Sequence, residues 1–165
     1  AIKTLTIDSK FQTLSKEFAV AKGCMFLVSG YSFPIALEGA LKLKELSYIH
    51  AEGFAAGEMK HGPIALIDKS MPVVFIAPQD ESFSKILSNI EEVKARKGII
   101  ITITDKVNTS LKSVSNFILT IPNTHKHVFP ITCSIILQML AYELAVYRGC
   151  EIDQPRNLAK SVTVE

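Results

Sequence analysis

Cysteine is scarce in this sequence of 165 residues, which contains only Cys24, Cys133 and Cys150. Their number is odd, they lie far apart, and no C-x-x-C pair occurs. This pattern argues against a disulfide framework or a zinc site, and it indicates reduced thiols in a cytoplasmic protein. Because Cys24 begins an apolar run and Cys133 lies inside another, we expect both thiols to be buried.

An excess of charge of one sign is also lacking. The chain has 18 basic and 16 acidic residues, a net charge of +2, and its basic residues are spread out without interleaved aromatic residues. This distribution gives no indication of a nucleic-acid partner. The longest apolar stretch, residues 131–146, contains Gln138 and Glu143 and is shorter than the roughly 18 residues of a membrane span, so no membrane association is expected.

Several motifs of known chemistry do not occur in the sequence. G-x-G-x-x-G, the P-loop, the G-x-S-x-G elbow and H-E-x-x-H are all missing. We therefore expect no nucleotide cofactor, no nucleophilic serine and no metal ion. The HKH run at 125–127 is interpreted as an exposed loop. No signal peptide is visible, and a first residue that is Ala and not Met indicates a piece of a longer protein.

Short apolar runs alternate with helical patterns along the chain. At 48% hydrophobic residues, the composition is that of an ordinary globular domain with a single core. The alternation predicts an α/β fold in three layers, with a four- or five-stranded parallel sheet between helices. Strands are expected at 24–30, 72–78, 99–104 and 117–122, and helices at 8–23, 34–49, 81–98 and 130–148.

The helix predicted at 34–49 carries an unusual set of charges. Glu38, Lys42 and Glu45 fall within about 60° of its circumference, since each residue turns the helix by about 100°. Most of the remaining surface is apolar, apart from Lys44 on the roughly opposite side. The acidic–basic–acidic row, called the charged stripe below, is either a solvent-facing salt-bridge ladder or an acid–base site in a polar cavity.

The segment after this helix, HAEGFAAGEMKHGP at 50–63, contains three glycines and several ionisable side chains. We interpret it as a loop that ends the helix and contributes to a site. Its two histidines, His50 and His61, are too far apart in sequence to share one helix face, so a metal site is not expected.

Two segments resemble a known family. PIALEGALKLKELSYIHAEGFAAGEMKHGPIALID (34–68) and DQPRNLAKSVTVE (153–165) are similar to the second sugar-isomerase (SIS) domain and the C-terminal tail of the glutamine–fructose-6-phosphate aminotransferases. The resemblance runs from about Cys24 to Glu165. It implies an SIS domain at 1–152 and a tail at 153–165.

The resemblance also implies a function. This family makes glucosamine 6-phosphate from fructose 6-phosphate and glutamine, with a glutaminase domain, a first SIS domain and a homodimer as partners. This chain contains no glutaminase domain. It also lacks an S-x-S-G-x-T phosphate loop. The most similar segment, SGYS at 29–32, matches that pattern poorly. The chain is therefore expected to supply half of the sugar site.

The family's functional residues correspond to six positions in this chain. Glu45 matches the carboxylate that moves the proton between sugar carbons, and Lys42 matches the lysine that assists at the sugar oxygens. His61 matches the ring-opening histidine, which reaches in from the neighbouring subunit. Lys160 matches the tail lysine that forms an imine with the open-chain sugar. Glu38 and Ala159 match substrate-binding positions.

Two other functions remain open on the sequence. The chain could be a sugar-phosphate-binding or dimerisation module without chemistry, but such a module needs no imine-forming lysine. It could also be a stand-alone phosphosugar isomerase or deaminase, but the missing phosphate loop argues against a self-sufficient site.

Overall fold

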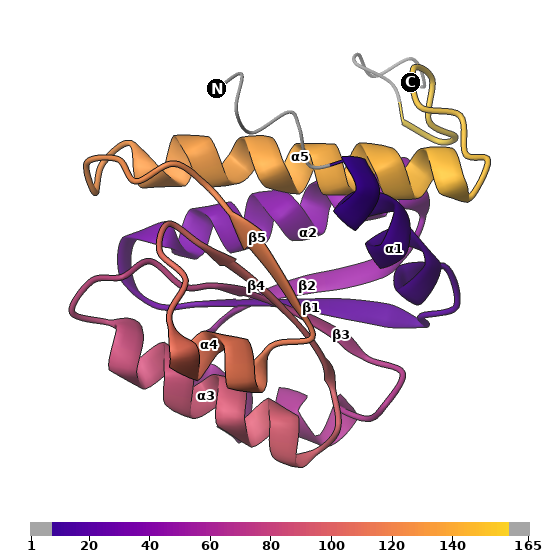
Figure 1. The fold of residues 1–165 in the computed structure, drawn as a ribbon. Helices are drawn as coiled ribbons and strands as arrows, with labels where there is room; N and C mark the ends of the chain where they lie inside the picture. Colours follow the sequence, from indigo (N-terminus) through magenta and orange to yellow (C-terminus); the bar gives the residue numbers. More distant parts are fainter. Residues whose placement is uncertain (1–7, 159–165) are drawn as a thin grey trace, which may run out of the picture.

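A computed structural model describes residues 8–158 of the chain (Figure 1). Its centre is a sheet of five parallel strands in the order β2-β1-β3-β4-β5. The strands are β1 (Gly23–Val28), β2 (His50–Ala55), β3 (Pro72–Ile76), β4 (Ile99–Thr104) and β5 (Phe117–Thr120). The predicted α/β class and parallel sheet are confirmed, with five strands.

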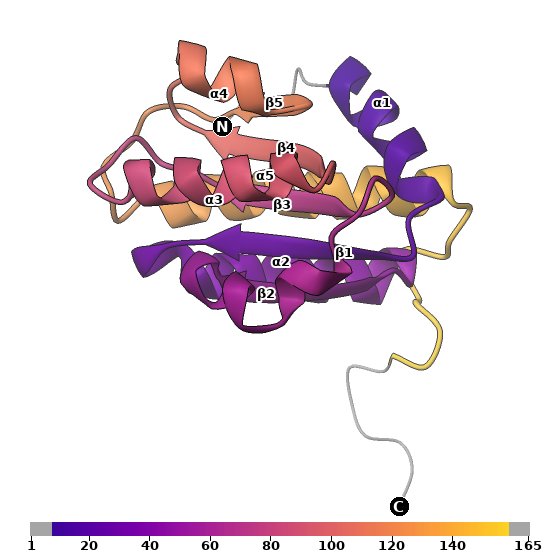
Figure 2. The same cartoon turned by 90° about the horizontal axis from the view of Figure 1, so that it is seen from below.

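Helices cover both faces of this sheet, which gives the predicted three layers (Figures 1 and 2). One face carries α1 (Asp8–Ala19), α2 (Phe33–Ser47) and α5 (Phe129–Tyr147). The other carries α3 (Phe83–Ala95), α4 (Thr109–Val114) and the short 3-10 helices η3 (Ala56–His61) and η4 (Pro63–Leu66). A further 3-10 turn, η2 (Gly30–Ser32), leads from β1 into α2.

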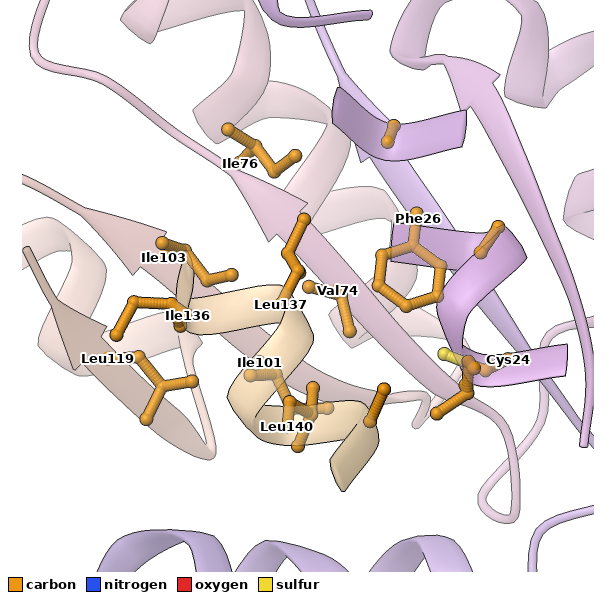
Figure 3. Close-up of a cluster of buried hydrophobic side chains, with 14 of the residues drawn as sticks. Cys24, Phe26, Val74, Ile76, Ile101, Ile103, Leu119, Ile136, Leu137 and Leu140 are labelled. Atoms are coloured by element: carbon orange, nitrogen blue, oxygen red, sulfur yellow. The ribbon is translucent and has the colours of Figure 1, made fainter. Parts of the chain in front are cut away.

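The core lies on both faces of the sheet. On the α2 and α5 side, Phe26 and Val74 of the sheet meet Leu137 and Leu140 of α5 (Figure 3). On the other side, Leu27 and Phe75 belong to a cluster that also contains side chains of α3. Strands β1 and β3 are buried along their whole length, because both of their faces are covered.

Helix α5 is long and apolar enough to span a membrane by length and composition. Its side chains at Phe129, Cys133, Leu137 and Leu144 are instead buried in the α2-side cluster. The helix is therefore a core element of this domain. Cys24 is also buried there, so the expected burial of both thiols is confirmed.

Two segments differ from the sequence-based prediction. Residues 50–63 were expected to form a loop, but 50–55 form the edge strand β2 and 56–61 the 3-10 helix η3. The glycine in β2 does not end a helix. A Cβ at Gly53 would lie 2.9 Å from the backbone of Ala36, so glycine lets β2 pack directly on α2. Helix α4, which Asn108 caps by accepting from the Leu111 N–H, was not predicted.

Candidate functional site

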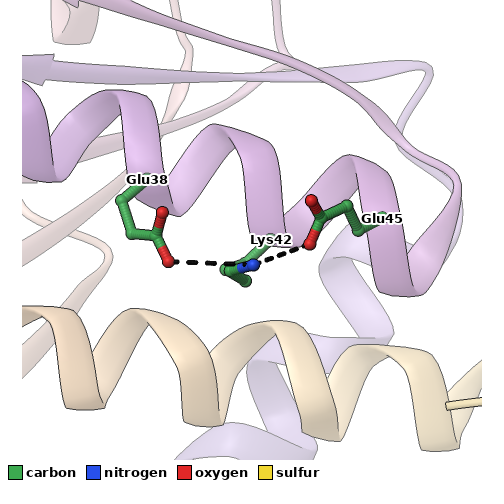
Figure 4. A network of polar contacts seen from close by, with 3 residues as sticks. All are labelled: Glu38, Lys42 and Glu45. Carbon is green, nitrogen blue, oxygen red and sulfur yellow. Dashed lines mark hydrogen bonds and ion pairs between the residues drawn. The ribbon is translucent and has the colours of Figure 1, made fainter. Parts of the chain in front are cut away.

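The charged stripe forms one connected group on α2 (Figure 4). Lys42 Nζ donates to Glu45 Oε2 at 2.7 Å and lies 3.9 Å from Glu38 Oε1. Leu, Ala, Glu and Lys, which form helices readily, fill most of this segment, and Pro34 occupies the first turn. The sequence therefore holds the three side chains on one regular helix, at i, i+4 and i+7.

The stripe is neither fully exposed nor enclosed. The side chains of Glu38, Lys42 and Glu45 are 34%, 29% and 21% exposed, and they project from the side of α2 toward α5 (Figure 4). Beside them on α2, Leu37 and Leu41 are 46% and 43% exposed. The surface of α2 therefore combines a half-buried ion network with two partly exposed leucines.

The network holds Lys42 in its charged form. The hydrogen bond to Glu45 raises the pKa of Lys42, with further contributions from the negative charges of Glu45 and Glu38, while partial burial acts in the opposite direction. Lys42 therefore remains a cation throughout the neutral range. It can place a proton donor and a positive charge next to the Glu45 carboxylate.

His61 lies apart from the stripe. It is an exposed residue at the end of η3, whose Met59 is buried in the cluster on the α3 side of the sheet. Lys60 of η3 pairs with Glu92 of α3 at 2.8 Å. Since α2 packs on the opposite face, the sheet separates His61 from Glu45 within one chain.

The predicted tail residues Ala159 and Lys160 lie outside the described residues. The segment before them runs past the C-terminal end of α2, where the Arg156 backbone N–H donates to Tyr48 Oη at 3.0 Å. The Arg156 guanidinium also lies over the Tyr48 ring, 4.2 Å from its centroid. Sequence reasoning missed both residues. The one local signal was a tyrosine at a helix end, where glycine is the common residue.

A pocket of about 410 Å³ opens at the carboxyl ends of the strands. It lies beside the junction of β1 and β3, where the strand order reverses and ligands of such sheets commonly bind. The pocket is lined by SGYS at 29–32, by 78–82, and by Asp105, Asn123, Thr124, Lys126 and Phe129.

The lining of this pocket is acidic. Asp80, Glu81 and Asp105 contribute three carboxylates against the one ammonium of Lys126. The Asp105 carboxylate accepts from the Gln79 backbone N–H and from Asn123 Nδ2, both at 3.0 Å, and so joins the loops that follow β3, β4 and β5. Negative side chains therefore outnumber positive ones in this lining, a balance that disfavours an anion.

No group of three or more His, Cys, Asp or Glu side chains is placed to hold a metal ion within residues 8–158. The HKH run at 125–127 is exposed, as expected, and a hydrogen bond of 3.4 Å joins the His127 N–H to His125 Nδ1. Within this range, the chemistry of the candidate site rests on the stripe.

Comparison with known proteins places this architecture in a family. The family model described as "SIS domain" matches residues 17–148. Glutamine–fructose-6-phosphate aminotransferase (isomerizing) from Bacteroides thetaiotaomicron is 53% identical over 163 residues, which cover 99% of this chain and 26% of the relative. The enzyme of the same name from Chlorobaculum tepidum is 54% identical over 154 residues, 91% of this chain and 25% of the relative.

A solved structure agrees with these relatives. The C-terminal domain of glucosamine-fructose-6-phosphate aminotransferase from Francisella tularensis superposes with a TM-score of 0.83 at 42% identity, covering 92% of this chain and 43% of that one. The chain spans about a quarter of the length of the curated relatives it matches. The predicted resemblance is confirmed by these matches, and the chain belongs to the SIS domain family.

Proposed function

We propose that this chain is the isomerase part of an enzyme that converts fructose 6-phosphate and glutamine into glucosamine 6-phosphate. In this proposal residues 1–152 form the SIS domain and 153–165 a tail that carries the imine-forming Lys160. The observation that carries the proposal is the stripe, a carboxylate held 2.7 Å from a protonated lysine on a half-buried helix face.

The chemistry of the reaction fits these groups. Moving a proton between two adjacent sugar carbons requires a fixed base, which Glu45 supplies. Lys42 places a positive charge beside that carboxylate and can donate to a developing sugar alkoxide. Lys160 would condense with the open-chain ketone and release water, and the resulting imine withdraws electrons from the carbon that loses its proton. Glu38 would hold Lys42 in place, and Ala159 would contact the substrate.

The proposal includes partners. The acidic pocket supports the idea that another domain binds the sugar phosphate. The exposed leucines beside the stripe support the idea that the same domain covers the stripe. His61 would act in the site of a second copy, because the sheet separates it from its own stripe. We propose a homodimer with a first SIS domain and a glutaminase domain. Its setting would be the cytoplasm, since all three cysteines are unpaired.

The test uses the full-length enzyme with Glu45→Gln. We expect glucosamine 6-phosphate formation to fall by at least about 100-fold, because the general base is lost while the side chain keeps its size. Glutamine hydrolysis should continue. The matched control is Glu17→Gln on the exposed surface of α1, which should leave both activities unchanged. Retained synthesis in Glu45→Gln would refute the role of the base.

A second arm of the test separates this function from a binding module. Borohydride reduction in the presence of fructose 6-phosphate should trap a covalent sugar adduct on Lys160, and Lys160→Arg should abolish it because a guanidinium does not form the imine. A binding module would give no adduct in either protein. If the chain is a stand-alone isomerase, the isolated chain should convert fructose 6-phosphate to glucose 6-phosphate. Phosphorus NMR would detect this product.

A further inference from the structure

The pocket at the carboxyl ends of the strands lies apart from the stripe. None of its lining residues belongs to the stripe, and Ser32, which borders it, precedes Glu38 by six residues, about 9 Å along a helix axis. Its volume of about 410 Å³ falls within the range of small-molecule sites, roughly 300–1,000 Å³. The proposed reaction does not use this pocket.

Two polar atoms of the lining residues have no hydrogen-bond partner within residues 8–158. They are Gln79 Nε2 and Thr124 Oγ1, and both are buried. The Gln79 amide is held through its other atom, since its Oε1 accepts from Asn108 Nδ2 at 3.2 Å. Buried polar groups are nearly always hydrogen-bonded, so an unpartnered pair beside a cavity indicates a ligand that supplies hydrogen bonds. A turn of either side chain would bring its polar atom within reach of a hydroxyl group in the pocket.

An aromatic ring stands at the edge of the pocket. Tyr31 lies in the η2 turn that follows β1, and it is 84% exposed. A tyrosine has an apolar ring and a polar tip, so it can cover the C–H face of a small ligand while its hydroxyl stays in water. Small-molecule sites commonly combine such a ring with a few polar groups.

Two of the three carboxylates in the lining are already engaged by the protein. Asp80 Oδ1 accepts from the backbone N–H and the hydroxyl of Ser82, at 2.8 and 2.6 Å. Asp105 accepts from the Gln79 N–H and from Asn123 Nδ2, both at 3.0 Å. A carboxylate has about four acceptor positions, so each can still accept from a ligand hydroxyl. These carboxylates therefore offer acceptors without requiring a cation.

Helix ends offset part of the negative charge. Each helix N-terminus carries about half a positive charge. Three helices begin at this pocket, since its lining includes the residues just before α2 and α3 and the first residue of α5, which are Ser32, Ser82 and Phe129. With Lys126, these helix ends leave the pocket close to neutral but still slightly negative. An uncharged ligand suits this balance better than a phosphate ester or a cation.

We propose that this pocket is a second ligand site, which binds an uncharged polyhydroxylated molecule about the size of a sugar ring and without a phosphate group. Its hydroxyls would donate to Asp80 and Asp105 and would bond Gln79 and Thr124, while Tyr31 covers the apolar face of the ring. A hydroxyl both donates and accepts, so one kind of group satisfies all of these partners. The site is separate from the reaction proposed for the stripe.

The experiment uses the full-length enzyme with glucose as the probe. An excess of fructose 6-phosphate is present to occupy sites for phosphorylated sugars. Saturation-transfer NMR measures the dissociation constant of glucose, which we expect at about 1–10 mM for a ligand of about a dozen heavy atoms. No binding up to about 100 mM would overturn the proposal.

Two relatives of glucose test the preference for an uncharged ligand. Glucosamine adds one positive charge and should bind within about tenfold of glucose, because the pocket is close to neutral. Glucuronate adds one negative charge and should bind more weakly, because its carboxylate cannot donate to Asp80 or Asp105. Glucosamine binding that is more than about tenfold tighter, or glucuronate binding as tight as that of glucose, would overturn the assignment to an uncharged ligand.

Two variants test the location of the site. Tyr31→Ala removes an exposed ring, and Thr124→Val removes an unpartnered hydroxyl while keeping the shape, so neither should lower the stability of the fold. Each should raise the dissociation constant of glucose by about fivefold or more. The matched control is Tyr147→Ala, at the other end of α5 from the pocket, which should leave binding unchanged. Unchanged binding in either pocket variant would overturn the proposal.

A third variant separates this site from the proposed function. Glu45→Gln, which should lose synthesis, should bind glucose as the unaltered enzyme does. If synthesis survives in Glu45→Gln, the role of the stripe fails while the pocket stands. If glucose binding is lost in Glu45→Gln, the probe occupies the stripe, and the second site is refuted.

Discussion

At the scale of single residues, the stripe is a small charge network with one cation between two carboxylates. Its Lys42–Glu45 hydrogen bond of 2.7 Å is the chief cause of the raised pKa of Lys42. Because the folded pKa is raised above its unfolded value near 10.4, the pairing stabilises the fold fully below that pH. This stabilisation is lost as the pH rises through the folded pKa.

Lys42→Met tests this dependence. The variant should be less stable at pH 7 by no more than about 1 kcal/mol, since partly exposed ion pairs contribute little. The difference in unfolding free energy should stay constant up to about pH 10 and shrink at higher pH. Urea unfolding across this range measures it, with Lys44→Met as the exposed control on the same helix. A difference that does not change in alkaline solution would contradict the assignment.

At the scale of elements, the position of the stripe depends on how closely α2 packs on its neighbours. A Cβ at Gly53 of β2 would lie 2.9 Å from the backbone of Ala36 and Leu37. A Cβ at Gly39 of α2 would lie 2.9 Å from Leu137 of α5. At Gly53 the backbones of β2 and α2 thus approach so closely that glycine is required, whereas at Gly39 a side chain of α5 would have to shift.

Gly53→Ala should therefore destabilise the domain by about 1–3 kcal/mol, because β2 or α2 has to move to make room for the added methyl group. Gly57→Ala is the matched control, since nothing lies within 4 Å of a Cβ there. It should leave the stability unchanged or slightly raised. Denaturant unfolding compares the two, and equal stabilities would refute the close-packing argument.

The same elements show what the sequence could predict. The strands β1, β3 and β4 could be predicted because they are short apolar runs with nearly every residue buried, and α2 and α5 because helical patterns alternate with such runs. Strand β2 was missed because it lies at an edge, only one of its residues, Ala51, is buried, and its glycine resembles a turn signal. The stripe followed from helical periodicity alone, whereas the Tyr48–Arg156 contact joins residues 108 positions apart and needed the fold.

At the scale of the whole molecule, the sheet places His61 and Glu45 on opposite sides. In the proposed function, a site that uses both would therefore combine two chains. Residue spacing does not reveal the topology of the fold. The sequence therefore assigned His61 to the site only through the family resemblance.

Mixing two inactive full-length variants tests the shared site. His61→Asn and Glu45→Gln should each be nearly inactive as homodimers. After exchange of subunits at equal amounts, half of the dimers are mixed, and each of these has one site with both residues intact. Synthesis should recover to about a quarter of the unaltered rate. No recovery, with subunit exchange verified by mass, would place His61 outside the partner's site.

The acidic pocket at the carboxyl ends of the strands has a consequence for how the rate depends on substrate concentration. Its three carboxylates and single lysine create a negative potential, which turns an approaching phosphate ester away. In a protein that contains two similar sheets, such a lining would restrict binding of the sugar phosphate to the equivalent pocket of the other sheet. At high concentration the substrate would then occupy that pocket without also binding unproductively in the acidic pocket. The rate should therefore saturate without substrate inhibition.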